Sequence, residues 1–121
     1  MKVILDTNFL IYCAREKIDY VEEISKIMIE GYELVVPLQV IFELEELKNT
    51  CKKLSDRQAA KLALLLLEAN KVRKIKIPGK TADQAITHLS KDNIVATHDF
   101  KLRRKLARSI VIKGKRKIDF Y

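Results

Sequence analysis

The sequence predicts an α/β fold in which a mainly parallel sheet carries helices on both faces. Short apolar runs rich in β-branched residues alternate with segments whose apolar residues recur at helical spacing, and this alternation is typical of such folds. The chain has 121 residues, of which 48% are hydrophobic and 33% are charged. This length and this balance fit one compact domain with its own core. We therefore expect a single domain over residues 1–121.

The first half of the chain predicts two strands and three helices. In order, the expected elements are strand 2–5, helix 7–14, helix 20–30, strand 33–36 and helix 38–49. Asp6 is the polar stop after the first strand, and the polar residues Thr7 and Asn8 begin the helix that follows. Gly31 ends the second helix. Pro37 ends the second strand, since proline is tolerated in the first turn of the next helix.

The second half predicts three more strands, which makes five in all. In order, the expected elements are helix 58–69, strand 72–77, helix 82–90, strand 93–97, helix 101–107 and strand 110–112, with a turn at Gly114 and a basic tail. Ser55 and Gln58 fit a capping box for the first of these helices, and Thr81 is expected to cap helix 82–90. That helix is apolar almost all round, so we expect it to be covered on several sides, either by its own chain or by a second copy in a homodimer. Alternating lysines predict that strand 72–77 lies at an edge of the sheet, whereas the apolar strand 93–97 is expected to be central.

The cysteines and the apolar runs exclude several classes of protein. Cys13 and Cys51 lie far apart, without the spacing of a zinc site or of a disulfide framework. The apolar run 62–67 is far too short to span a bilayer, and the N-terminal apolar run is interrupted by Asp6 and lacks a cleavage signature. We expect a cytoplasmic protein that has no membrane partner.

Positive charge is concentrated in the last fifth of the chain. The net charge is +8, and residues 99–121 hold nine Lys or Arg against two acidic residues, a net +7. The other 98 residues are therefore nearly neutral. A basic block of this kind indicates a polyanionic partner, most often a nucleic acid, although a merely solvated basic surface is the alternative.

Four acidic residues are expected at one edge of the sheet, because right-handed crossovers bring every junction from a strand to a helix to the same edge. They are Asp6, Glu43, Asp83 and Asp99. Each has an ordinary explanation alone, as a helix cap, a favourable charge at a helix start or a member of a surface ion pair. Together, four neighbouring carboxylates repel one another unless some are protonated or cations bind there. Oxygen ligands without His or Cys suit Mg²⁺ or Mn²⁺.

A divalent ion beside a basic segment predicts phosphodiester chemistry, in which the metal activates a water and stabilises the leaving oxygen. Asn8 and Thr97 are candidates to orient the acidic ligands, although Asn8 is equally explained as a helix-start residue. We expect His98 to be a solvent-facing loop residue. Tyr12 and Tyr20 are expected to pack in the protein, although either ring could stack on a base.

Four segments of this chain resemble the PIN-domain nucleases over nearly its whole length. They are VILDTNFLI, VIFELEEL, TADQAI and IVATHDFKLRRKL. The last segment is most similar to the PIN nucleases that process small-subunit preribosomal RNA, and it also resembles the shorter VapC toxins. The resemblance implies a three-layer α/β/α sandwich around a five-stranded, mainly parallel sheet. It also implies that Asp6, Glu43, Asp83 and Asp99 are the catalytic metal ligands and that Asn8 and Thr97 support them.

Two residues depart from the pattern of these nucleases. Gln84 stands where many relatives carry a second acid beside Asp83, and His98 stands where asparagine is common. Neither change removes one of the four acids. We therefore expect that activity is retained but that metal affinity is altered.

The resemblance implies an Mg²⁺- or Mn²⁺-dependent endoribonuclease that cuts single-stranded or loop RNA and leaves a 5′-phosphate, in rRNA processing or RNA turnover. The residues expected to hold RNA phosphates are Lys101, Arg103, Arg104, Lys105 and Arg108. One alternative is a VapC-type toxin ribonuclease, whose partner would be an antitoxin rather than a preribosomal particle. A second alternative is a non-catalytic RNA-binding ribosome-assembly factor. A phosphatase with an aspartyl nucleophile is disfavoured, because Asn8 stands where that mechanism needs a second acid.

Overall fold

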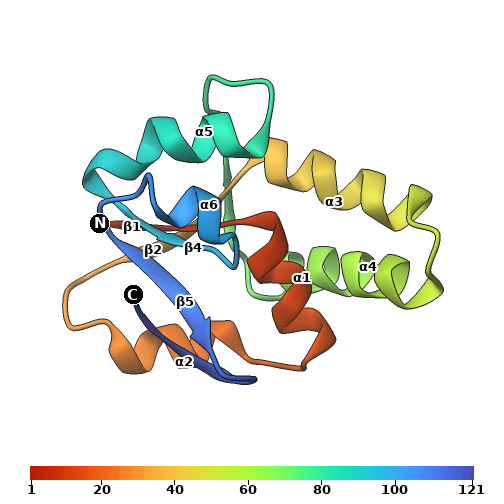
Figure 1. The fold of residues 1–121 in the computed structure, drawn as a ribbon, viewed down its shortest axis with the longest axis horizontal. Coiled ribbons are helices and arrows are strands. Elements are labelled where there is room, and N and C mark those ends of the chain that lie inside the picture. The colour runs from red at the N-terminus through yellow and green to blue at the C-terminus, as the bar shows by residue number, and fades with distance from the viewer.

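The computed structural model describes residues 1–121 and contains a six-stranded sheet with helices on both faces (Figure 1). The strands are β1 (Lys2–Leu5), β2 (Glu33–Pro37), β3 (Arg73–Ile75), β4 (Ile94–Ala96), β5 (Ser109–Lys113) and β6 (Lys117–Phe120). Their order in the sheet is β3-β2-β1-β4-β5-β6, and all neighbours are parallel except β5 and β6. The predicted α/β class, the edge position of β3 and the central position of β4 are therefore confirmed.

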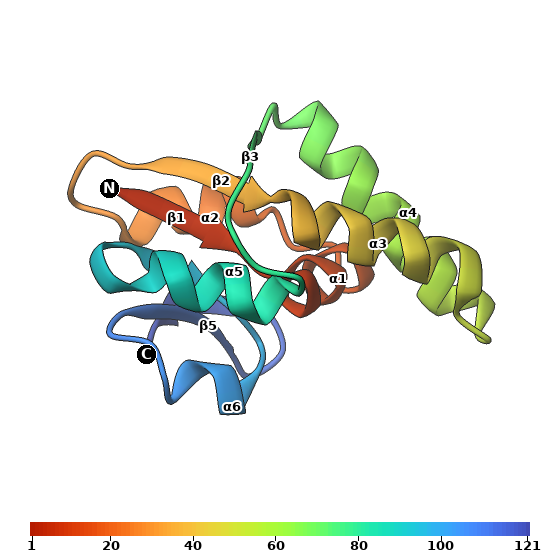
Figure 2. The same cartoon turned by 90° about the horizontal axis from the view of Figure 1, so that it is seen from above.

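Six α-helices and one short 3₁₀ helix connect the strands. They are α1 (Thr7–Arg15), α2 (Tyr20–Ile27), α3 (Leu38–Thr50), α4 (Leu54–Ala69), α5 (Ala82–Leu89), the 3₁₀ helix Ser90–Asp92, and α6 (Phe100–Arg103). Figure 1 shows α5 above the strands and α2 below them, which is the three-layer arrangement. Figure 2 shows that α3 and α4 lie side by side and extend beyond the end of the sheet.

The core forms around β1, the central strand through which the two halves of the sheet meet. Val3, Ile4 and Leu5 are completely buried, as the continuous apolar run of a parallel strand requires. Phe9 of α1 packs edge-on against Tyr20 of α2, with ring centroids 6.3 Å apart. Burial of such side chains contributes about 1.5–3 kcal/mol each, so the end of β1 is a rigid support for the residues that follow it.

The predicted basic tail is in fact a strand, and this prediction was wrong. Gly114 adopts a positive φ of 63° in a tight turn, and Lys117–Phe120 then pairs antiparallel with β5. Ile118 is only 3% exposed and packs into the core. The alternation of charged and apolar residues in this segment is the strand signal that the high density of lysines concealed.

The last helix was predicted over 101–107, but α6 is a single turn from Phe100 to Arg103. The cause is topological. Because β5 runs parallel to β4, the chain must return along the whole strand length between residues 97 and 108, which leaves room for one helical turn. The basic residues of this segment therefore do not share one long helix face.

The helix α4 begins earlier than predicted, at Leu54 rather than residue 58. Ser55 lies inside this helix, and the N-cap residue Lys53 makes no side-chain hydrogen bond, so the predicted capping box is wrong. The expectation that α4 is covered on several sides is met within the chain, because α4 packs against both α3 and α1. Leu62 and Leu65 stay 39% and 56% exposed, and the homodimer stays a prediction.

The other helices and the cysteines differ little from expectation. Helix α2 stops at Ile27, three residues before the predicted end, because Met28 is already extended. Both cysteines are free, and burial raises the pKa of the Cys13 thiol to about 12. No helix combines the length and the apolar character that crossing a bilayer demands.

Candidate active site

Asp6 is the most deeply buried of the four predicted acids, at the carboxyl end of β1. It is 3% exposed, and it caps α1 because its Oδ1 accepts a hydrogen bond of 2.8 Å from the Thr7 N–H. Its Oδ2 accepts a hydrogen bond of 2.7 Å from the Thr97 hydroxyl. The pKa of Asp6 is raised from 3.8 to about 6, mainly by burial and to a smaller extent by the charges of Asp83 and Glu43, against the lowering effect of the two hydrogen bonds.

The electrostatic effect of Glu43 and Asp83 on Asp6 shows that three of the predicted acids share one end of the sheet. Glu43 lies on α3, and its Oε2 accepts a hydrogen bond of 3.2 Å from the Ala82 N–H in the first turn of α5. This bond satisfies one of the free N–H groups at that helix start. Asp83 is the next residue of α5 and is exposed to solvent.

Gln84, the first departure from the nuclease pattern, has a local structural role. Its N–H donates to the Thr81 hydroxyl at 3.2 Å, as the predicted cap requires, and its Oε1 accepts from the Lys80 N–H at 2.8 Å. This reciprocal pair resembles a capping box and fixes the start of α5. Gln84 therefore positions the helix that carries Asp83.

Asp99 follows β4 and caps α6, as its position in the sequence predicts. Its Oδ1 accepts hydrogen bonds from the N–H groups of Lys101 at 2.9 Å and Leu102 at 3.2 Å. Its own N–H donates to the Thr97 hydroxyl at 3.0 Å. Because the same hydroxyl donates to Asp6, Thr97 connects the two acids that end the neighbouring strands β1 and β4.

Asn8 holds the loop that contains Asp99. Its Oδ1 accepts a hydrogen bond of 3.0 Å from the His98 N–H and lies 3.5 Å from the Thr97 hydroxyl oxygen. The structure thus places Asn8 and Thr97 beside the acids that the sequence predicted them to support. His98 lies in a loop, as predicted, but it is half-buried, with its ring 4.7 Å from that of Tyr12 and 6.0 Å from that of Phe100.

The donor set fits a hard divalent cation, although the side chains are not gathered around one point. All four predicted ligands are carboxylates, which suits Mg²⁺ or Mn²⁺. No group of three or more His, Cys, Asp or Glu side chains is arranged to hold a metal ion. Asp83 is exposed and Glu43 is half-buried, so neither carboxylate is enclosed in the core. A cation there would offset the repulsion that raises the pKa of Asp6.

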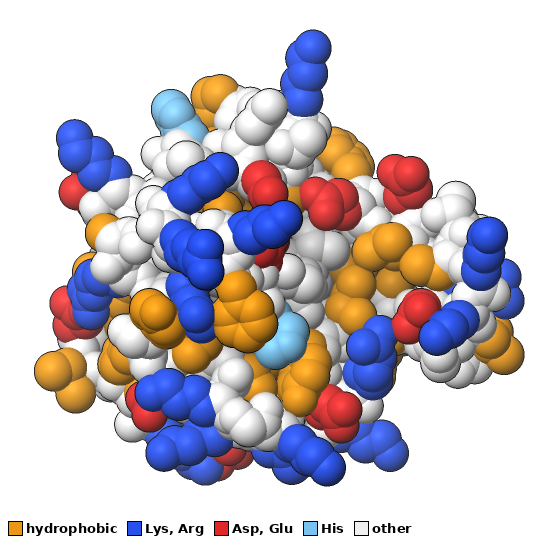
Figure 3. Space-filling view, viewed as in Figure 1, with side chains coloured by type: hydrophobic (Ala, Val, Ile, Leu, Met, Phe, Trp, Pro, Cys, Tyr) orange, Lys and Arg blue, Asp and Glu red, His pale blue; other side chains and the backbone are white.

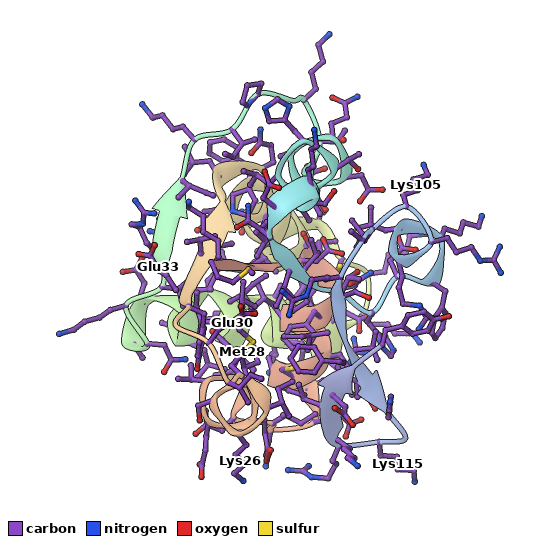
Figure 4. All side chains as sticks on the ribbon, turned by 90° about the vertical axis from the view of Figure 1, so that its left-hand side faces the viewer. Lys26, Met28, Glu30, Glu33, Lys105 and Lys115 are labelled. Carbon is purple, nitrogen blue, oxygen red and sulfur yellow. The ribbon has the colours of Figure 1, made fainter.

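The predicted RNA-binding residues differ in how free they are. Lys101, Arg104 and Lys105 are exposed and form no ion pair, whereas Arg108 is paired with Glu30 at 3.0 Å. Figure 3 shows Lys and Arg side chains gathered over α6, next to acidic side chains at the centre of that face. Figure 4 shows Lys105 pointing outward on the side opposite Glu33.

An open polar hollow joins the acidic and the basic groups. It has a volume of about 430 Å³ and is lined by Asp83, Gln84, Thr87, His88 and Lys105. A carboxylate and an ammonium group that face the same solvent-filled space can hold a cation and a phosphate next to each other. This hollow brings a residue of the basic segment beside one of the predicted metal ligands.

Sequence reasoning missed the aromatic residues beside the acids. Phe100 and Tyr121 are 58% and 74% exposed, and the Arg103 guanidinium lies over both rings. The position of Phe100 directly after Asp99 was the available signal. Tyr20 is buried, and Tyr12 packs against His98 while its hydroxyl donates to the Lys115 carbonyl, so the predicted packing of both tyrosines is confirmed.

Comparisons with known proteins agree with the fold described above. Ribonuclease VapC4 of Methanocaldococcus jannaschii is 36% identical over 109 residues, which are 87% of this chain and 82% of that protein. The structure of the PIN domain endonuclease Utp24 has a TM-score of 0.74 at 23% identity, covering 98% of this chain and 90% of that one. The structure of VapBC2 from Rickettsia felis, bound to a DNA fragment from the promoter, has a TM-score of 0.63 at 16% identity, covering 94% and 99%. These two structures share the fold.

The family assignment rests on a match that spans almost the entire chain. A family model described as a PIN like domain matches residues 3–114, which include all four predicted acids and the basic segment around α6. The sequence relative and the six-stranded fold agree with that match. The chain therefore belongs to the PIN-like domain family.

Proposed function

We propose that the protein is a divalent-metal-dependent endoribonuclease. The observation that carries this proposal is the buried carboxylate of Asp6, which is held at the end of β1 within electrostatic reach of Glu43 and Asp83. A fold retains such mutual repulsion only where a cation or a proton offsets it. The relative VapC4 is named a ribonuclease, and the basic surface over α6 supports a polyanionic substrate.

In this proposal the four acids hold the ion, and Mg²⁺ or Mn²⁺ would supply an activated water and charge neutralisation for in-line displacement at phosphorus. Thr97 keeps Asp6 and Asp99 in fixed orientations, because its hydroxyl bonds to both residues. Asn8 holds the loop before Asp99. The Thr97 hydroxyl thus holds the Asp6 carboxylate and the Asp99 backbone, and the N–H groups of Lys101 and Leu102 hold the Asp99 carboxylate, so less ordering is required during the reaction.

The basic residues would hold the RNA backbone. Lys101, Arg104 and Lys105 have no acidic partner in the protein and can therefore pair with phosphates. Lys105 lies at the hollow that also contains Asp83, so a phosphate bound there would be next to the acidic site. Contacts of this kind position RNA without reading its sequence.

A role as a VapC-type toxin is a second candidate, and one observation favours it. The chain is 36% identical to VapC4 over most of both lengths, whereas its likeness to Utp24 is one of fold. The partner in that case would be an antitoxin that covers the acidic site. A role in rRNA processing, with a preribosomal particle as partner, stays a prediction, as does the cytoplasmic location.

The first experiment is cleavage of a labelled RNA that contains single-stranded loops, with Mn²⁺, with Mg²⁺ and with EDTA. Wild type is compared with Asp6→Asn and with Asp56→Asn, a matched change at a half-exposed acid that pairs with Arg15. We expect wild type and Asp56→Asn to cut the RNA only when Mn²⁺ or Mg²⁺ is present. We expect Asp6→Asn not to cut it under any of the three conditions. Binding of RNA without cleavage by any of the three proteins would favour the non-catalytic assembly factor.

A further inference from the structure

A row of aromatic and cationic side chains leads away from the acidic site. We call it the stacking row, and it consists of His98, Phe100, Arg103 and Tyr121. The rings of His98 and Phe100 lie 6.0 Å apart, and the Arg103 Cζ lies 4.6 Å from the Phe100 centroid and 3.7 Å from the Tyr121 centroid. Because His98 and Phe100 flank Asp99 in the chain, the row begins at one of the proposed metal ligands.

The fold holds the inner end of this row in place. The His98 ring packs against Tyr12, whose hydroxyl donates to the Lys115 carbonyl at 2.9 Å in the turn between β5 and β6. The His98 N–H donates to the Asn8 side chain. Two residues of α1 thus hold the His98 backbone and contact its ring, which places the ring at the inner end of the row.

The outer end of the row faces solvent. Phe100 and Tyr121 are 58% and 74% exposed, so part of each ring is accessible to a ligand. The Arg103 guanidinium lies over both rings, and its Nε is buried without a hydrogen-bond partner. A buried guanidinium N–H without a partner is unfavourable unless an acceptor reaches it.

We propose that the stacking row binds an unpaired nucleobase of the RNA on a nucleotide next to the phosphate that is cut. The identity of the ligand as RNA rests on the proposed function. Exposed aromatic rings flanked by a guanidinium form the surface on which unpaired bases stack. The exposed cations Lys101 and Arg104 lie on the same short segment and complement the phosphates of that strand.

This placement has a consequence for substrate choice. Bases inside a duplex already stack on their neighbours and cannot reach the Phe100 ring, whereas bases in loops and single strands can. The row therefore selects unpaired RNA beside the acidic site, while the basic residues contribute affinity for any phosphate backbone. Stacking tolerates every base, so sequence preference should be modest.

The test measures binding in EDTA, where the proposed cleavage cannot occur. The ligands are a labelled ten-nucleotide oligoadenylate and a fully abasic strand of the same length, which keeps every phosphate. We expect wild type to bind oligoadenylate roughly tenfold more tightly than the abasic strand, within the range observed for one stacked base. Phe100→Leu should lose this preference, whereas Phe100→Trp should keep it.

The chain contains no tryptophan, so Phe100→Trp also introduces a fluorescent reporter at one position. Its emission should be quenched by oligoadenylate but not by the abasic strand. Leu65→Ala is the control, because Leu65 is 56% exposed on α4 and has no part in the row. Circular dichroism and thermal unfolding show that each variant is folded before its binding is compared.

The outcomes separate this inference from the proposed function. A preference for bases that Phe100→Leu abolishes supports the stacking row even if metal-dependent cleavage is never seen. Equal binding of both strands by wild type, or an undiminished preference in Phe100→Leu, overturns it even if the protein cuts RNA. The absence of any RNA binding by wild type in EDTA overturns the stacking row, whereas the proposed function is decided separately by the cleavage assay with metal.

Discussion

The two sides of the acidic site are built differently. On the side of the sheet, Asp6 and Asp99 follow neighbouring strands and are tied together by the Thr97 hydroxyl. On the side of the helices, Asp83 is exposed, and Glu43 makes one hydrogen bond to the start of α5. The sheet thus fixes two carboxylates in advance, whereas the helices leave two able to adjust.

The largest expected effect concerns the acids of the fixed side. Asp99→Asn should lower RNA cleavage by about a thousandfold, since removal of one ligand charge weakens an interaction with the metal that contributes several kcal/mol. The fold should survive, because asparagine caps a helix as well as aspartate does. Asp83→Asn, on the adjustable side, should cost only about tenfold, because water can replace an exposed ligand. Equal losses in cleavage rate for the two variants would contradict the contrast between the sides.

The second effect is a dependence of stability on pH that arises from Asp6. The pKa of Asp6 is raised from 3.8 to about 6, so the folded protein binds this proton more tightly than the unfolded chain does. The contribution of Asp6 to stability is therefore greatest below about pH 4, falls as the pH rises to about 6 and stays low above it. The whole change corresponds to ~3 kcal/mol.

Asp6→Asn removes the buried charge and should therefore raise the free energy of unfolding at pH 7.5 by up to ~3 kcal/mol, with little change near pH 4. Urea unfolding of both proteins in EDTA at several pH values between 4 and 7.5 measures the difference. Asp56→Asn, at a half-exposed acid, serves as the control. A variant that is no more stable than wild type at pH 7.5 would show that burial of the Asp6 charge is not unfavourable.

The third effect tests the hydroxyl that joins the two fixed acids. Thr97→Val keeps the shape of the side chain but removes its bonds to Asp6 and Asp99, and cleavage should fall about 10- to 100-fold. Thr50→Val is the matched control, since the Thr50 hydroxyl donates to the Glu46 carbonyl at the far end of α3. Unchanged cleavage in Thr97→Val would mean that the backbone alone positions both acids.

The smallest expected effect concerns the basic residues, which also differ in whether the protein already holds them. Lys101→Ala should reduce the slope of log affinity for single-stranded RNA against log salt concentration by about 0.7, the value for one lost phosphate contact. Arg108→Ala should change the slope less, because Arg108 is already paired with Glu30 at 3.0 Å. Fluorescence titrations at salt concentrations from about 50 to about 300 mM compare the two slopes. A larger change for Arg108→Ala would show that RNA displaces Glu30.

Much of the fold could be predicted because its signals are local. The apolar run before Asp6 gave a strand and a helix start within a residue of their true bounds, and Thr81 caps α5 as expected. The predictions were wrong where contacts between distant parts of the chain determine the structure. Helix α6 is short because β5 must lie parallel to β4, and the basic tail becomes β6 because Ile118 can be buried against the core.

The candidate site shows the same division. The sequence predicted four acids at one edge of the sheet, with the polar residues Asn8 and Thr97 beside them. This was possible because strand ends and crossover handedness follow regular rules. It could not predict that Gln84 would stabilise the start of α5 or that Glu30 would form an ion pair with Arg108. Those roles depend on side chains from different elements meeting at hydrogen-bond distance.

By itself, the sequence determined the α/β class, the family and the candidate acids, since periodicity and motif order are properties of neighbouring residues. Only the tertiary structure decided that burial raises the pKa of Asp6 and that His98, Phe100, Arg103 and Tyr121 form one row. The physical reason is that desolvation and ring contacts depend on which surfaces the packed elements bring together. Residues 103 positions apart in the chain, such as Tyr12 and Lys115, meet only in the folded protein.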